Sequence, residues 1–538
     1  MAEAADVFDF VVVGAGSAGC AVAGRLSEDG RYSVLLLEAG PEDKAFWIHV
    51  PLGFPMLFTD PKVNWMFETE PEPNLRNRRN YVPRGKVLGG SSAINGMVYM
   101  RGHPRDYDLW RQKGCVGWGY DDVLPYFRKS EDQERGADEF HGVGGPLVVT
   151  DQRIRSAIGE AAVAAAQQAG IPFTPDFNGV QQEGAGYYQT TIRGKRRWSS
   201  ARAFLYPARN RKTLKIETMA HLTRLLFDQG RAVGVEYRTP SGLKTVKVRG
   251  EIVLSGGAVG SPHMLQYSGI GPGEHLRDHG IDVVRDLPQV GANMVDHFSA
   301  ATMYHCTRPI TINDMARTRF GRWKAGIQYV LFKRGMLADN GIHAGILTRT
   351  DPRLERPDIQ FNVTNWSVGS RTKAGLQPHK HPGFSLNVVH LNPDSRGSVR
   401  LKSPDPLADP AIYQHFMSTQ HDIDAMVAGI KIARKITSQP AFAPYIEREI
   451  VPGDRSKTDD EIVAFLRATG GPNLHPVGSC RMGADDTCAV DPRLRVRGME
   501  GLRIADASIM PTIPAGNTNA PCIMIGEKAA AMILEDAR

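Results

Sequence analysis

Val7-Phe-Asp-Phe-Val-Val-Val-Gly-Ala-Gly-Ser-Ala-Gly19 joins a run of β-branched and aromatic residues to a glycine-rich turn. Such a run is typical of a buried parallel strand. Cys20 to Leu26 then has the composition of a helix, and Tyr32 to Leu37 predicts a second strand that ends in Glu38. The sequence therefore predicts a βαβ unit of the Rossmann type.

The turn has the G-x-G-x-x-G pattern, formed by Gly14, Gly16 and Gly19. Glycines at these positions allow a tight turn and let the backbone approach a pyrophosphate at the helix N-terminus. Glu38 stands about 20 residues further on, where an acid binds ribose hydroxyls and disfavours a 2′-phosphate. A tight turn without a ligand is the alternative, but strand, helix, second strand and acid all coincide here. We therefore predict a dinucleotide site, although the motif alone does not choose between NAD and FAD.

Two further glycine-rich stretches lie at Gly85–Gly102 and Glu251–Gly271. The first has serines and an asparagine between its glycines, which indicates backbone amides exposed to a bound group rather than a packed helix. The second reads as a strand that runs into a glycine turn. A nicotinamide dehydrogenase would explain neither stretch.

Composition limits the class of protein. The 538 residues suggest two domains, and 41% hydrophobic with 23% charged residues fits a globular chain. The formal charge is +7, with Lys and Arg scattered rather than in tracts, so no nucleic-acid partner is expected. There is no evident signal peptide and no apolar run of roughly 18 residues. We expect a cytoplasmic protein with at most peripheral membrane contact.

Cysteines and histidines give no sign of a metal or of dithiol chemistry. The six cysteines contain no C-x-x-C, which argues against a disulfide flavoreductase. Cys480 is expected to be a small buried residue. His381, His390, His415 and His421 lack metal-ligand spacing, so no metal is expected.

The middle of the chain, about Ser299–Thr469, alternates apolar and polar residues. Asp358–Val363, Phe384–Val389 and Ser398–Leu401 predict strands of an antiparallel sheet with one face covered. Asp422–Thr437 has helical spacing. Thr311–Phe320 and Val368–His381 are expected to be loops, either of which could act as a lid.

Near the C-terminus, two turn-rich segments each present one polar side chain. They are His475–Gly483 and Gly516–Pro521, and they offer the His475 imidazole and the Asn517 amide. A histidine that satisfies a loop carbonyl and an asparagine that caps a turn are the alternatives, and Asn519 could be mistaken for Asn517. Our hypothesis is a general base aimed at the bound cofactor.

Together these motifs resemble the glucose-methanol-choline (GMC) family of FAD oxidoreductases, and within it the bacterial choline dehydrogenases and FAD-linked alcohol dehydrogenases. The resemblance spans almost the whole chain. Besides the stretches above it rests on Asp176–Gly179, Arg197–Leu205, Pro357–Gln360 and the run from Val490 to Glu527.

The resemblance implies the GMC fold, with an α/β FAD-binding Rossmann-like domain and an α+β substrate domain with an antiparallel sheet. The first would comprise residues 1–150, 199–298 and 470–538. The second would comprise residues 151–198 and 299–469.

The same resemblance implies the cofactor contacts. The residues expected to hold the ADP half of FAD are Gly14, Gly16, Ser17, Ala18, Gly19 and Glu38, with the Leu222 backbone at adenine. Those expected along the pyrophosphate, ribityl chain and flavin are Ser91, Asn95, Gly96, Met97 and Val98. Asp506, Ala507 and Asn517 would close over the flavin. Ile94 stands where some relatives attach FAD through histidine, so non-covalent FAD is expected.

Alcohol oxidation follows as the expected activity. The resemblance implies that His475 removes the hydroxyl proton while flavin N5 accepts a hydride, and that Asn517 binds the alcohol oxygen. Electrons would pass to a quinone or a similar acceptor. An oxygen-using oxidase is the alternative, and a flavin-dependent lyase or decarboxylase is a weaker one.

The substrate is open at this point. Choline needs aromatics plus a carboxylate, and candidates such as Trp65, Trp366 and Tyr413 have no assigned neighbours. A primary aliphatic or aromatic alcohol is the more conservative expectation.

Overall fold

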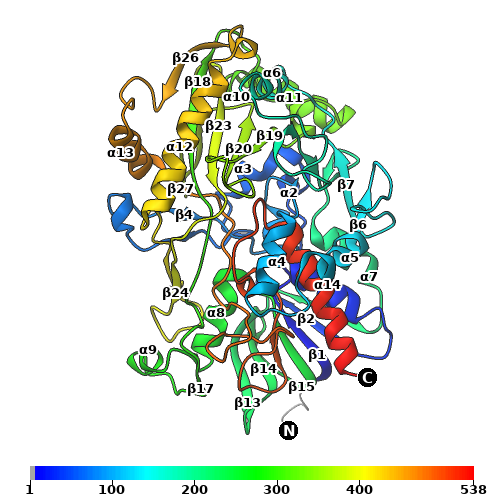
Figure 1. Cartoon of the computed structure of the whole chain (residues 1–538). Coiled ribbons are helices and arrows are strands. Elements are labelled where there is room, and N and C mark those ends of the chain that lie inside the picture. The colour runs from blue at the N-terminus through cyan, green and yellow to red at the C-terminus, as the bar shows by residue number, and fades with distance from the viewer. Residues whose placement is uncertain (1–5) are drawn as a thin grey trace.

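The computed structural model describes residues 6–538, so the leader of residues 1–5 lies outside the described part. Two seven-stranded sheets lie toward opposite ends of the molecule (Figure 1). The C-terminus lies at the end that holds β1 and β15. Among residues 6–538, no helix combines the length and apolarity that a bilayer crossing requires.

The first sheet has the strand order β12-β2-β1-β15-β14-β13, with β28 also on β15. Its β12, β2, β1, β15 and β28 run parallel, whereas β14 runs antiparallel to both of its neighbours, β15 and β13. The bounds are β1 Val7–Val13, β2 Val34–Glu38, β12 Leu214–Thr218, β13 His221–Asp228, β14 Arg231–Thr239, β15 Gly242–Leu254 and β28 Leu502–Ile504.

The predicted βαβ unit is present in this sheet. β1 is buried from Phe10 onward because it pairs with a neighbour on each side and lies beneath helices. Helix α1 (Ser17–Leu26) follows the glycine turn, and α14 (Asn519–Asp536) packs on it. A Cβ at Gly526 would lie 2.5 Å from the Ala18 carbonyl oxygen, so a glycine is required for this close approach.

The second sheet is antiparallel, in the order β26-β18-β23-β20-β19-β8, with β27 also on β18. Its strands are β8 Gly184–Tyr187, β18 Phe298–Cys306, β19 Ile342–Thr348, β20 Ile359–Thr364, β23 Gly383–His390, β26 Ile446–Val451 and β27 Gly471–Pro472. Helices α6 (Ala157–Gln168) and α12 (Gln420–Thr437) pack against it, and α13 (Asp459–Thr469) packs on α12. Along β18 every second residue is buried, as expected for a sheet with one covered face.

A small four-stranded sheet, β5-β9-β7-β6, is the third unit of the fold. Its strands are β5 Val98–Tyr99, β6 Glu131–Gln133, β7 Leu147–Asp151 and β9 Gln189–Thr190, and the nearby helices are α4 (Pro104–Gln112) and α5 (Tyr120–Ser130). The α/β and α+β architecture is thus confirmed, while the domain boundaries themselves remain a prediction.

Three local expectations were wrong. The Thr311–Phe320 segment contains helix α10 (Ile312–Arg317) and the start of α11 (Arg319–Phe332), and Val368–His381 forms the hairpin β21 (Val368–Thr372) and β22 (Gly375–Pro378). Strand β24 (Ser398–Arg400) pairs only with β25 (Ala411–Tyr413), outside the large antiparallel sheet. Only β24 depends on a partner outside its own segment, because β21 and β22 pair with each other and α10 begins at a capping box formed by Thr311 and Asp314.

Candidate active site

One cavity of about 730 Å³ runs from the turn after β1 to the loop that carries His475. Every predicted site residue except Gly19 lines it; these are Gly14, Gly16, Ser17, Ala18, Glu38, Ser91, Asn95, Gly96, Met97, Val98, Leu222, His475, Asp506, Ala507 and Asn517. Gly19 lies behind the turn, where a Cβ would come within 1.9 Å of the Gly14 carbonyl oxygen.

The first glycine turn can be made only by small residues. Gly14 has φ +101°, and a Cβ there would lie 2.5 Å from the Ser255 carbonyl oxygen. The turn leads directly into α1, whose free N–H groups are suited to a phosphate. Ser17 Oγ donates to Asn519 Oδ1 at 2.7 Å, which joins the start of α1 to the start of α14.

Glu38 ends β2 inside this cavity. Its carboxylate oxygens accept the Ala15 and Gly40 N–H groups, each at 2.9 Å. Burial raises the pKa of Glu38 to about 7, although these hydrogen bonds oppose the rise. Because each carboxylate oxygen has a second lone pair, Glu38 can still accept a ribose hydroxyl.

The Gly85–Gly102 stretch forms the next part of the wall and rests on the first turn. A Cβ at Gly90 would lie 2.7 Å from the Gly16 Cα. Asn95 Oδ1 accepts the Met97 N–H at 3.0 Å and Arg197 Nη1–H at 2.8 Å. Arg197 is buried, which lowers its pKa to about 9, and it supports this loop from behind.

Asp506 and Leu222 shape the wall through contacts within the protein. Asp506 Oδ2 accepts the Ser261 hydroxyl at 2.5 Å and the Gly257 N–H at 2.8 Å, so it fixes the turn between β15 and α8 (Gly257–Tyr267). The Leu222 carbonyl accepts the Tyr267 hydroxyl at 2.9 Å.

His475 and Asn517 meet at the other end of the cavity. His475 Nε2 lies 3.1 Å from Asn517 Nδ2. The His475 backbone N–H donates to Asp296 Oδ1 at 2.7 Å. Asn517 Oδ1 has no hydrogen-bond partner among residues 6–538. An alcohol oxygen placed beside both side chains would therefore contact a proton acceptor and an amide.

The Asn517 loop is itself held in place. Asp106 Oδ2 accepts the Ala515 N–H at 2.7 Å, and Gln182 Nε2 donates to the Ala515 carbonyl at 3.0 Å. Two segments distant in sequence thus fix the backbone next to Asn517. Asn519, by contrast, already binds Ser17.

His297 contacts the opposite edge of the His475 ring, with the two Nδ1 atoms 3.0 Å apart. Burial, with the nearby Arg84 cation, lowers the pKa of His475 to about 3. Burial also holds the pKa of His297 well below its usual range. Both rings are therefore neutral at pH 7. The Asn517 amide beside Nε2 favours the tautomer of His475 that carries its proton on Nδ1, the nitrogen that faces His297.

The sequence interpretation missed His297 and its neighbour Asp296. Both are buried and come directly before β18, between apolar residues. A polar pair inside an apolar segment is the one signal that could have pointed to them. Arg84 was also missed; its Nη2 donates to the Leu474 carbonyl at 2.6 Å, beside His475.

The charges on the cavity wall are divided between its two ends. The acidic lining residues are Glu38, Asp409 and Asp506, which belong to the glycine-turn and Leu222 end. Around His475 the lining is neutral or cationic: Phe54, Arg84, Met303, Asn362, Thr364, Trp366, Arg371, Ser385 and Asn387. Trp65 lies at the other end against His221, and Tyr413 is not part of the lining.

One histidine group does approach metal-binding geometry despite its sequence spacing. His390, His421 and Asp422 bring potential ligand atoms within 4.8 Å of one another. However, the Asp422 carboxylate already accepts the backbone N–H groups of Asp394 and Ser395, at 2.7 and 2.9 Å. This cluster lies apart from the cavity lining.

The cavity fits a flavin dinucleotide. It begins at a glycine-rich turn at a helix N-terminus and passes a buried acid at the end of β2. It then continues past a second glycine-rich loop to the His475–Asn517 pair.

Comparisons with known proteins agree with this fit. The N- and C-terminal models of GMC oxidoreductase match residues 8–299 and 393–526. An alcohol dehydrogenase [acceptor] of Pseudomonas putida is 43% identical over 535 residues, 98% of this chain and 96% of that protein. An oxygen-dependent choline dehydrogenase of Brucella melitensis is 43% identical over 530 residues, 98% and 95% of the two chains.

Solved structures show the same architecture. Pyridoxine 4-oxidase from Mesorbium loti superposes with a TM-score of 0.89 at 30% identity, covering 97% of this chain and 98% of that one. A formate oxidase of Aspergillus oryzae, solved in work on FAD modification, has a TM-score of 0.92 at 26% identity, with 99% of each chain covered. The chain therefore belongs to the GMC oxidoreductase family, and its cofactor is FAD.

Proposed function

We propose that the protein oxidises a neutral primary alcohol to an aldehyde. The observation that carries the proposal is the His475–Asn517 pair, with Nε2 and Nδ2 3.1 Å apart, in the cavity that fits FAD. FAD, when bound, supplies the acceptor for the hydride of the alcohol carbon.

The protein residues handle the proton and the oxygen. His475 Nε2 takes the hydroxyl proton, since its ring is neutral at pH 7. Asn517 donates its amide N–H to the alcohol oxygen and stabilises the negative charge that develops there. In the tautomer with the proton on Nδ1, His297 accepts that N–H, so Nε2 of His475 is the nitrogen that faces the substrate and takes its proton.

The choice of a neutral substrate rests on the charge of the wall. Choline dehydrogenases are among the relatives, and a quaternary ammonium substrate requires aromatic faces and usually a carboxylate. Around His475 the described lining has Trp366 and Phe54 but no acid, and it carries Arg84 and Arg371. These two cations disfavour a cationic substrate there, although the buried Asp296 beside them, which accepts the His475 N–H, offsets part of their charge.

The remaining features follow the same proposal. Ile94 offers no nucleophile for covalent attachment, so FAD is bound non-covalently. A quinone or a similar acceptor takes up the electrons, with oxygen as the alternative. The His475–Asn517 pair argues against a flavin-dependent lyase or decarboxylase. We further propose a cytoplasmic location with at most peripheral membrane contact and no nucleic-acid partner.

Turnover of an alcohol panel tests the proposal. The purified yellow enzyme is supplied with aliphatic and aromatic primary alcohols and choline, with a quinone analogue under nitrogen and, separately, with air. We expect aldehyde from a neutral alcohol, little turnover of choline, and faster turnover with the quinone analogue. Preference for choline would refute the substrate class, and faster turnover with oxygen would make the protein an oxidase.

Replacing Asn517 by alanine should lower kcat about 10²-fold, because one donor to the developing alkoxide is lost. Asn517→His keeps a donor at the same place and should recover much of the rate. Steady-state kinetics on both variants checks this. Equal rates in the wild type and the alanine variant would show that Asn517 does not contact the reacting oxygen.

Replacing His297 by phenylalanine should lower kcat roughly 10- to 100-fold, since the buried Nδ1–H of His475 loses its acceptor. His297→Gln offers a carbonyl oxygen instead and should restore part of the rate. The readout is the pH profile of kcat as well as its size. A purely structural role would lower the amount of folded enzyme but leave the pH profile of the remainder unchanged.

A further inference from the structure

Helix α11 carries an apolar stripe on its outer face. Phe320, Trp323 and Leu331 are 69%, 63% and 68% exposed, and Val330 is exposed as well. Phe320, Trp323 and half-buried Ile327 follow one another at intervals of three and four residues, and Val330 and Leu331 lie three and four residues after Ile327, so all five share one side of the helix. We call this set the α11 stripe.

The opposite side of α11 already anchors the helix. Ala325 and Tyr329 are buried. The Tyr329 hydroxyl lies within hydrogen-bond distance of the His49 and Lys195 carbonyl oxygens, at 3.3 and 3.2 Å, and donates its single hydrogen between them. The α11 stripe is therefore not needed to pack the helix. An exposed apolar patch of this kind usually marks an interaction site.

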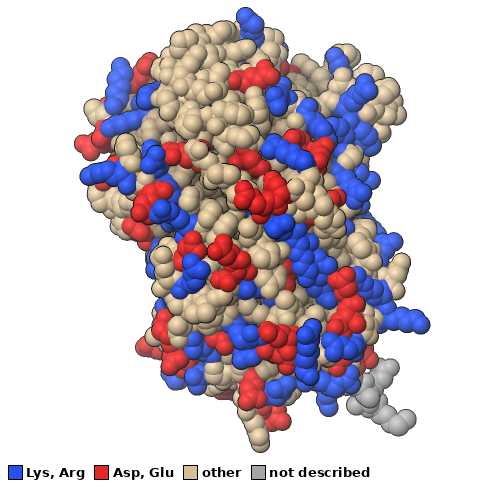
Figure 2. Space-filling view, turned by 45° about the vertical axis from the view of Figure 1, so that its right-hand side comes forward, with Lys and Arg blue, Asp and Glu red and all other residues tan. Residues whose placement is uncertain are grey.

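The segment around the stripe is strongly basic. Between Asp314 and Asp339 the chain has six cationic side chains and no acid: Arg317, Arg319, Arg322, Lys324, Lys333 and Arg334. Within residues 6–538 none of the six forms an ion pair. Elsewhere basic and acidic side chains are interspersed, as the lower half of the face in Figure 2 shows.

The helix adjoins the substrate end of the cavity. Ile312 and Met315 of α10 pack in one cluster with Phe54 and Trp366, which line the cavity near His475. Helix α2 (Phe46–His49), which Tyr329 contacts, adds two more exposed aromatic side chains, Phe46 and Trp47. Figure 1 shows α10 and α11 at the end of the molecule away from β13–β15.

We propose that the α11 stripe and its flanking cations dock the protein onto an anionic lipid bilayer. An amphipathic helix with aromatic residues on one face and Lys and Arg around it binds in the interface plane without crossing the membrane. A symmetric contact between two copies would place these six cations against their equivalents, which disfavours a dimer. Lipid phosphates neutralise the same charges. This docking does not depend on which alcohol is oxidised.

Flotation of the FAD-loaded protein with vesicles tests the proposal. Vesicles of phosphatidylcholine with phosphatidylglycerol are compared with phosphatidylcholine alone. Two double variants change the α11 stripe and its flanking cations. The apolar variant combines Trp323→Ser with Leu331→Ser, and the charge variant combines Arg322→Glu with Lys324→Glu. Two further double variants are the matched controls. Phe173→Ser with Leu243→Ser removes exposed apolar residues outside α11, and Lys212→Glu with Lys247→Glu reverses exposed cations outside α11.

We expect the wild type and both controls to float with anionic vesicles. Each α11 variant should bind at least tenfold more weakly. The charge variant loses roughly fivefold for each cation removed, and the apolar variant loses the side chains that would enter the bilayer interface. Turnover with a soluble alcohol and acceptor should be unchanged in all five proteins. No vesicle binding by the wild type, or equal binding by the α11 variants, would overturn the proposal. A wild-type dimer that the Trp323→Ser and Leu331→Ser changes dissociate would assign the stripe to a second copy instead.

Discussion

Replacing His475 by alanine is expected to slow alcohol-dependent flavin reduction by on the order of 10²–10⁴, the usual contribution of a positioned base. His475 Nε2 is the neutral, cavity-facing nitrogen of the site, and Asn517 cannot replace it because an amide is not basic. The variant should still be yellow, because the glycine turn and Glu38 that hold the cofactor are remote from position 475. Rapid mixing under nitrogen, followed at the flavin absorbance, measures the rate.

A second cavity histidine supplies the control. His379 also lines the cavity, and its Nδ1 lies 3.1 Å from Ser367 Oγ rather than beside Asn517. His379→Ala should change the rate of flavin reduction only slightly. If both alanine variants lose the same activity, the effect is one of packing and His475 is not the base.

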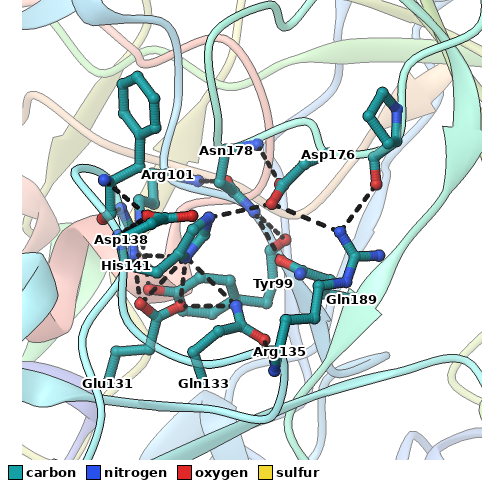
Figure 3. A network of polar contacts seen from close by, with 12 residues as sticks. Tyr99, Arg101, Glu131, Gln133, Arg135, Asp138, His141, Asp176, Asn178 and Gln189 are labelled. Carbon is teal, nitrogen blue, oxygen red and sulfur yellow. Dashed lines mark hydrogen bonds and ion pairs between the residues drawn. The ribbon is translucent and has the colours of Figure 1, made fainter.

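Replacing Glu131 by alanine is expected to destabilise the protein by ~3–5 kcal/mol, the cost of leaving buried charges without their partner. Figure 3 shows the network around it. Glu131 is fully buried, and its carboxylate accepts Arg101 Nη2–H at 2.6 Å and the His141 Nδ1–H at 3.1 Å. His141 Nε2–H donates to Asp176 Oδ2 at 2.9 Å. Loss of Glu131 leaves two cations in the interior with one carboxylate.

The network also predicts a pH dependence. Burial lowers the pKa of His141, but the hydrogen bonds to Asp176 and Glu131 outweigh it and raise the pKa to about 9. A pKa raised on folding contributes stability that is complete below the ordinary histidine value near 6.5 and is lost as the pH rises through 9. The Tm difference between wild type and Glu131→Ala should therefore shrink above pH 9.

Glu134 is the matched control, because it lies three residues away and pairs with Arg153 on the surface. Glu134→Ala should cost less than about 1 kcal/mol. Thermal unfolding of the FAD-loaded proteins compares the variants. A Glu131→Ala protein as stable as the Glu134→Ala protein would show that the buried network does not stabilise the fold.

Much of the fold could be predicted because short-range patterns encode it. The β-branched run before Gly14 and the alternation along Asp358–Val363 each specify a strand whatever its partner is. Pairing is different: Ser398–Arg400 has strand character, but only the folded chain brings Ala411–Tyr413 beside it. Helix α10, by contrast, has a local signal in the capping box of Thr311 and Asp314.

Part of the site could also be predicted from the sequence. His475 and Asn517 lie in turn-rich segments that resemble family motifs, and the structure brings their side chains together from positions far apart in the sequence. His297 lies in no such motif, and its only local signal is that it follows Asp296 within an apolar segment. Its role depends on the contact between its ring and that of His475, and this contact joins two distant parts of the sequence.

The most direct test of the account follows flavin reduction under nitrogen by a primary alcohol and by the same alcohol deuterated at C1. We predict rapid bleaching of the flavin, slower with the deuterated alcohol because its C–H bond is broken in that step, and nearly absent in His475→Ala. A FAD-loaded wild type that no alcohol bleaches would contradict alcohol oxidation at this site.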